Sequence, residues 1–92
     1  MTQRPSLLDT DQELLELLRQ EPRQTPSMLF ASADSTGSKQ YIQDRLAHLR
    51  DHGLAERPDR GIYQLTDRGQ VASDHLDRYR DDRDAFWALV DD

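Results

Sequence analysis

Two histidines, His48 and His52, stand four residues apart and are the best candidates for metal ligands in the chain. That spacing places both imidazoles on one side of a helix, with Asp44 one turn earlier, so the three side chains could hold a zinc ion. The alternative is structural, because histidines near the C-terminus of a helix interact favourably with its dipole. Leu49 and Arg50 follow His48, so the glutamate of an H-E-x-x-H site is missing. We expect no metal and no cofactor.

Catalytic patterns are equally scarce. The chain has no cysteine, which excludes a thiolate zinc site, a cysteine nucleophile and a disulfide scaffold. It has neither a glycine-rich phosphate loop nor a G-x-S-x-G motif. The 18 acidic residues are scattered, so carboxylate pairs are frequent and none of them indicates acid–base chemistry. We expect that the protein is not an enzyme and has no catalytic residues.

The clearest binding chemistry lies on a helix predicted over residues 38–52. Ile42, Leu46 and Leu49 recur at i, i+4 and i+7, which is the buried stripe of an amphipathic helix. Ser38 is the predicted N-cap, and Gly53 is a typical C-terminal stop.

The opposite face of this helix is polar. A glutamine can pair with adenine through two hydrogen bonds, and an aspartate can accept one from the amino group of cytosine. Ser38 and the free N–H groups at the helix start can hold a phosphate. The alternative is a solvated face without a ligand. The side chains that point this way are Gln40, Gln43, Asp44 and the small Ala47, with Lys39 on one shoulder of the face.

The surrounding elements follow from caps, turns and periodicity. A first helix begins at a Thr10–Glu13 capping box and ends before Pro22, and a second, over 26–33, turns Met28 and Leu29 inward. Two short runs with alternating apolar residues, 54–57 and 62–66, flank the turn residues 58–61 and predict a β-hairpin. A long helix over 67–90 completes one domain, 1–92. We predict an α+β, mostly α fold with three helices, a two-stranded hairpin and a C-terminal helix.

The last helix carries the sharpest amphipathic pattern. Its aspartates face away from one narrow arc, and two aromatic residues lie about four turns beyond the hairpin, where a small domain has little to cover them. We expect a homodimer through this helix, with packing on its own domain as the alternative. The predicted interface residues are Leu76, Tyr79, Arg83, Phe86, Trp87 and Val90.

The stretch 38–69, SKQYIQDRLAHLRDHGLAERPDRGIYQLTDRG, resembles winged helix-turn-helix transcription regulators of the MarR-like and phage-repressor-like kind found in halophilic archaea. The resemblance covers residues 10–72, with a core of 10–66. It implies a repressor that binds double-stranded DNA as a homodimer, with helix 38–52 in the major groove and the wing at 58–61 on the backbone or minor groove. By position it assigns base reading to Ser38, Lys39, Gln40, Gln43 and Asp44, and wing contacts to Arg57 and Arg60. Asp44 departs from the basic or small residue of many relatives.

The charge balance leaves a second function open. The chain has 12 basic and 18 acidic residues and a formal net charge of −6, with Lys39 its single lysine. An aspartate excess with little lysine resembles the proteins of extreme halophiles, in which molar salt screens self-repulsion. The same acidity suits a protein-interaction module that docks a basic partner without binding DNA. Clustering of Lys39, Arg45, Arg57 and Arg60 on one face would favour DNA.

The sequence contains no apolar run of the ~20 residues needed to cross a bilayer. Its N-terminus also lacks the apolar stretch of a signal peptide. We therefore expect a cytoplasmic protein without a membrane partner. No pattern identifies an effector ligand.

Overall fold

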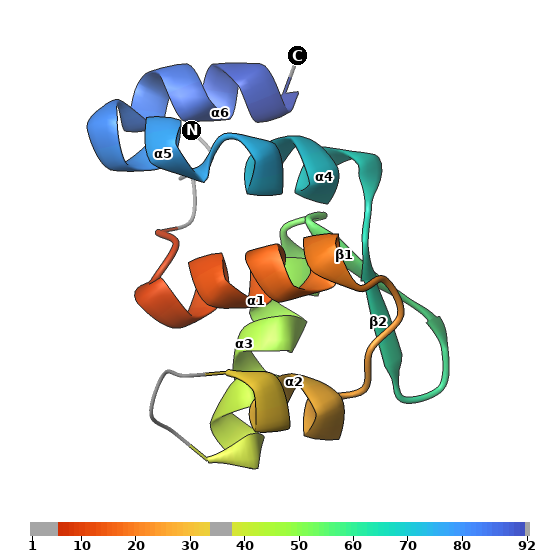
Figure 1. Ribbon diagram of the computed structural model, residues 1–92. Coiled ribbons are helices and arrows are strands. Elements are labelled where there is room, and N and C mark those ends of the chain that lie inside the picture. The colour runs from red at the N-terminus through yellow and green to blue at the C-terminus, as the bar shows by residue number, and fades with distance from the viewer. Residues whose placement is uncertain (1–5, 34–37, 92) are drawn as a thin grey trace.

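The computed structural model describes residues 6–33 and 38–91, which are mostly helical with one antiparallel hairpin (Figure 1). This confirms the predicted α+β, mostly α class. Within these ranges no helix is both long and apolar enough to span a bilayer. The elements in chain order are α1 (Asp9–Gln20), α2 (Pro26–Ser32), α3 (Lys39–Asp51), β1 (Ala55–Asp59), β2 (Ile62–Leu65), α4 (Asp67–Asp74), α5 (Leu76–Asp81) and α6 (Arg83–Asp91).

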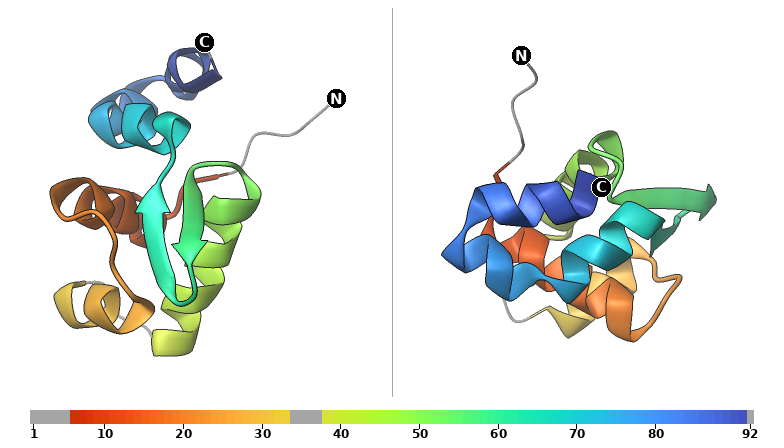
Figure 2. Two further views of the ribbon diagram at one scale, coloured as in Figure 1. Left: turned by 90° about the vertical axis from the view of Figure 1, so that its right-hand side faces the viewer. Right: turned by 90° about the horizontal axis from the view of Figure 1, so that it is seen from above.

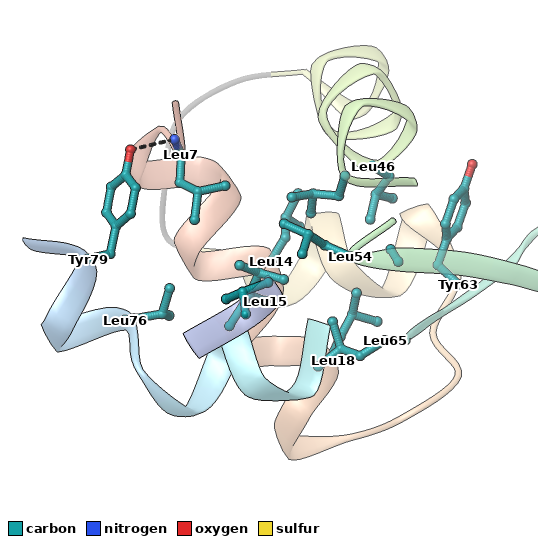
Figure 3. Packing of buried hydrophobic residues seen from close by; sticks show 14 of the residues in the cluster. Leu7, Leu14, Leu15, Leu18, Leu46, Leu54, Tyr63, Leu65, Leu76 and Tyr79 are labelled. Carbon is teal, nitrogen blue, oxygen red and sulfur yellow. Dashed lines mark hydrogen bonds between the residues drawn. The ribbon is translucent and has the colours of Figure 1, made fainter. Parts of the chain in front are cut away.

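α1 is the central element of the core. It packs against α2 and α3 on one side and against α4 on the other (Figure 1). Leu14, Leu15 and Leu18 of α1 are fully buried. Figure 3 shows them in one cluster with Leu65 of β2 and Leu76 of α5. Because each buried leucine contributes ~1.5–3 kcal/mol, α1 holds the two sides of the molecule together.

Capping side chains fix the starts of α2 and α3. Thr25 Oγ1 accepts the N–H of Met28 at 3.2 Å, with Pro26 in the first helical position. Ser38 Oγ accepts the N–H of Tyr41 at 3.1 Å in the same way. Both predicted caps are confirmed.

Two local expectations are wrong. α1 begins one residue before the predicted Thr10–Glu13 box, and the carboxylate that returns to the helix start belongs to Asp11, which accepts the N–H of Leu8 at 2.9 Å. Met28 is 42% exposed, because the short α2 reaches the core through the following residue instead.

The predicted hairpin is present and turns where the sequence indicated. β1 and β2 pair antiparallel, with Asp59 opposite Ile62, so Arg60 and Gly61 form the turn. Gly61 has φ +78°, a conformation that a residue without Cβ adopts at little cost.

A single residue that precedes α2, Gln24, pairs with the hairpin as a third extended segment. No sequence pattern predicts this pairing. Gln24 forms an isolated antiparallel bridge with Tyr63: its N–H donates to Tyr63 O at 3.0 Å and its carbonyl accepts the Tyr63 N–H at 2.8 Å. The Gln24 side chain also donates to the carbonyls of Leu17 and Glu21, at 2.8 and 2.7 Å. Gln24 thereby ties the end of α1 to β2.

The C-terminal segment corrects the prediction of one long helix over 67–90. The chain turns at His75 and Asp82, and α6 folds back against α4 and α5 (Figures 1 and 2). Asp82 starts the new helix, since its Oδ1 accepts the N–H of Ala85 at 3.2 Å. A short polar cap thus interrupts a periodic pattern that would fit a continuous helix.

The fold-back covers the predicted interface within one chain. Phe86 is 0% and Trp87 4% exposed, and their rings meet edge to face with centroids 4.9 Å apart. The expectation that these aromatics lack cover in their own domain is therefore wrong. Arg83 stays exposed, with its guanidinium 4.9 Å from the centroid of the Tyr79 ring. The other predicted interface residues, also buried, are Leu76, Tyr79 and Val90.

Candidate nucleic-acid interface

α3 has one buried face and one uncovered polar face. Ile42, Leu46 and Leu49 are buried against α1 and α2, as their spacing predicted. Because these three side chains fix the rotation of the helix, its opposite face points away from the core. On that face Gln40 and Asp44 are exposed and Gln43 is half-buried, while Ser38 and Lys39 are exposed at the start of the helix.

Two side chains of this face are joined to each other. Gln40 Nε2 donates to Asp44 Oδ1 at 3.0 Å, one helical turn along. The pair leaves one amide N–H, the amide oxygen and the second carboxylate oxygen for other partners. The remaining N–H and the amide oxygen of Gln40 can make a two-pronged contact with adenine only in the side-chain orientation that the hydrogen bond to Asp44 holds. Gln43 has no such restraint among the described residues, so it is the better adenine reader.

The hairpin presents two arginines beside this helix. β1 packs against α3, and the hairpin projects from the body of the molecule (Figure 2). Arg57 and Arg60 are exposed, and among the described residues neither has a carboxylate oxygen within 4.0 Å of a guanidinium nitrogen. The main-chain N–H of Arg60 donates to Asp59 Oδ1 at 2.7 Å, which steadies the turn. Both guanidinium groups remain open to an anion.

A third arginine lies beside the hairpin, and the sequence did not predict it there. Arg23 has φ +65°, which costs a residue with a Cβ about 1–2 kcal/mol, and the adjoining Gln24 bridge holds it there. Its Nε donates to Gln64 Oε1 at 3.3 Å, and Gln64 in turn donates to Glu56 Oε1 at 2.6 Å. No periodicity or motif marks this position.

Arg45 does not lie on the outward face, so it is not clustered with Lys39, Arg57 and Arg60. Its Nε and Nη2 donate to the two carboxylate oxygens of Asp11 at 2.7 and 2.5 Å. Asp11 is 0% exposed, and the side chain of Arg45 is 19% exposed. The hydrogen bonds to Asp11 raise the pKa of Arg45 above its ordinary value. This pair ties α3 to the start of α1 and leaves Lys39, Arg57 and Arg60 as the exposed cations of the predicted set.

His48 of α3 and His52, the C-cap residue of that helix, contact each other. Their ring centroids are 4.6 Å apart, and Nε2 of His48 is buried without a hydrogen-bond partner among the described residues. Burial, followed by the charge of Arg45 and the neighbouring His52, lowers the pKa of His48. Within residues 6–33 and 38–91 no three histidine, cysteine, aspartate or glutamate side chains gather as a metal site would require.

Comparison of the chain with protein-family models, with curated proteins and with solved structures finds no match in any of the three. The resemblance of residues 38–69 to winged helix-turn-helix regulators therefore stays a prediction. The side chains themselves offer hydrogen-bonding groups on α3 and cations on the adjacent hairpin. That combination suits a ligand with both phosphates and base edges.

Proposed function

We propose that the protein is a winged helix-turn-helix DNA-binding regulator, acting as a repressor, with α3 in the major groove and the β1–β2 hairpin as the wing. One observation carries the proposal: the uncovered polar face of α3 lies beside a hairpin whose two arginines have no carboxylate partner among the described residues. A helix fits the major groove, and flanking cations reach phosphates.

The proposed role of each residue follows from its hydrogen-bonding groups and charge. Gln43 reads adenine, while the Gln40–Asp44 pair presents mainly acceptors and therefore favours the amino group of cytosine. Ser38 already accepts a hydrogen bond as N-cap, so its hydroxyl contributes to phosphate binding as a donor. Lys39, exposed at the first helical position, adds a positive charge there.

Substituting the base readers tests the role of α3. Gln43→Ala should weaken binding to a duplex selected from a random pool by ~1–3 kcal/mol, with the fold retained, because the side chain is not part of the core. Gln70→Ala, which removes an exposed glutamine of α4, is the control and should have no effect. Full affinity in the double variant Gln40→Ala/Gln43→Ala would disprove the assignment.

Substituting a wing arginine tests the hairpin. Arg60→Ala should weaken binding to all duplexes about equally, since phosphate contacts position a protein without specifying sequence. Arg78→Ala, an exposed arginine of α5, is the matched control. Fluorescence anisotropy with the selected duplex and a scrambled one separates the outcomes. A changed sequence preference at constant overall affinity would contradict the role.

The second candidate is a protein-interaction module, favoured by Asp44 and Asp51. Both carboxylates are exposed on α3, in a chain of net charge −6, and would attract a basic partner. In that case Asp44→Asn/Asp51→Asn should abolish binding of an arginine-rich peptide, and Arg60→Ala should leave it unchanged. For the DNA-binding protein, the two aspartate substitutions should strengthen non-specific duplex binding, because they remove repulsion from phosphates.

We also propose a homodimer on a palindromic site, in the high salt that the acidic composition suits. Two recognition helices one turn of DNA apart, ~34 Å, need a two-fold contact. The buried C-terminal aromatics do not supply it, so another surface must. Sedimentation in molar KCl with and without duplex tests this pairing: a one-to-one complex on a complete palindrome would rule it out.

A further inference from the structure

A groove of about 430 Å³ lies between the start of α1 and the turn from α5 to α6, away from the polar face of α3. Two hydrogen bonds hold its floor. The N–H of Leu7 donates to the Tyr79 hydroxyl at 2.7 Å, as Figure 3 shows, and Gln12 Nε2 donates to the carbonyl of Leu7 at 3.1 Å. Leu7, Gln12 and Tyr79 are buried, so the floor is a fixed part of the fold.

Two arginines that line this groove have no carboxylate partner in the part of the chain that the structure describes. Arg80 Nε donates to Gln12 Oε1 at 2.9 Å, which leaves the outer N–H groups of its guanidinium available. Arg83 lies over the ring of Tyr79, 4.9 Å from its centroid. No described carboxylate oxygen lies within 4.0 Å of either guanidinium, although the chain has 18 acidic residues. Neutral groups therefore position both cations and leave their charges uncompensated at short range.

We propose that this groove binds a small organic monoanion, namely a carboxylate on an apolar body. Guanidinium groups match the two oxygens of a carboxylate, with short, charge-assisted hydrogen bonds. The third charged lining residue, Asp9, reduces the local formal charge to +1, which one carboxylate neutralises and a dianion exceeds. Leu8, 45% exposed in the lining, provides apolar surface for the body of the ligand.

Titration of the full-length chain tests the site without any use of DNA. The probes are sodium hexanoate, the uncharged hexanamide, sodium acetate and inorganic phosphate. Binding of each probe is monitored through the amide shifts in ¹⁵N–¹H spectra. Hexanoate should bind saturably and shift amides at residues 7–12 and 79–83. Hexanamide, acetate and phosphate should each bind at least about tenfold more weakly than hexanoate. Hexanamide lacks the charge, acetate lacks the apolar body, and phosphate does not carry a single carboxylate charge.

Four variants locate the binding. Arg80→Gln and Arg83→Gln should each weaken hexanoate binding by about tenfold, and Arg78→Gln, an exposed arginine outside the groove, by less than about twofold. Asp9→Asn should tighten it several-fold, because it removes a repulsive charge.

Three results would contradict a carboxylate site in this groove. Absence of saturable binding, equal binding of hexanamide, or unchanged affinity in both groove variants would overturn the proposal. Should Arg80→Gln disturb the contact with Gln12, Arg83→Gln provides the comparison, since Arg83 rests on the Tyr79 ring alone among the described contacts.

Discussion

At the scale of single residues, the Asp11–Arg45 pair determines how α3 sits on α1. Asp11→Asn removes a fully buried charge and leaves a largely buried guanidinium without its partner. Breaking such a pair costs ~3–5 kcal/mol, and we expect about 3 because Arg45 keeps some contact with water. Urea unfolding at neutral pH measures it. Asp74→Asn, which breaks a half-exposed pair with Arg19, should cost less than about 1 kcal/mol. Equal losses in the two variants would contradict this role.

His48 makes the stability depend on pH. Burial lowers the pKa of His48 below its ordinary 6.5, so the unfolded chain takes up this proton first as the pH falls. The free energy of unfolding should therefore decrease as the pH falls through about 6.5 towards the folded-state value. In His48→Gln this decrease should be smaller than in the wild type, whereas His75→Gln should retain it. Urea titrations at several pH values compare the three proteins; identical profiles would refute the prediction.

At the scale of elements, α4 lies so close to the end of the α3–β1 connection that residue 69 cannot carry a side chain. A Cβ on Gly69 would lie 1.8 Å from the carbonyl oxygen of Leu54, so α4 must shift in Gly69→Ala, and we expect a loss of about 3 kcal/mol. Gly61→Ala meets nothing within 4 Å and should lose only the ~1 kcal/mol of its left-handed backbone. Denaturant unfolding ranks the two, and the reverse order would contradict this packing.

The sequence predicted those helix starts and turns that depend on residues close to one another in the chain. The Thr25 and Ser38 caps and the Gly61 turn each depend on neighbours close in sequence, so the sequence predicted them. The C-terminal segment was mispredicted because periodicity does not distinguish a continuous helix from one that folds back at Asp82. Asp11, the partner of Arg45, lies 34 residues away in the sequence, and no local pattern predicts a contact over that separation.

At the scale of the whole molecule, α6 completes the core of one chain. Phe86→Ala should therefore cost about 3–5 kcal/mol, while Leu89→Ala, on an exposed part of the same helix, should cost about 1 or less. Because the burial is intramolecular, the stability loss caused by Phe86→Ala should not depend on the protein concentration over a roughly hundredfold range, whichever surface the proposed homodimer uses. A loss that grows with concentration would show that the apolar face of α6 contacts a second chain.

The most direct test of the proposed function maps the DNA-binding face on the intact protein. Residues 38–52 and the hairpin carry the polar and cationic groups, and α4–α6 lie on the other side of α1 (Figure 1). The ¹⁵N–¹H spectrum of the full-length chain is titrated with a duplex selected from a random pool, in dilute and in molar KCl. We predict saturable shifts at Gln40, Gln43, Arg57 and Arg60, with α6 unaffected. A selection that enriches no duplex, or shifts confined to α4–α6, would contradict the account.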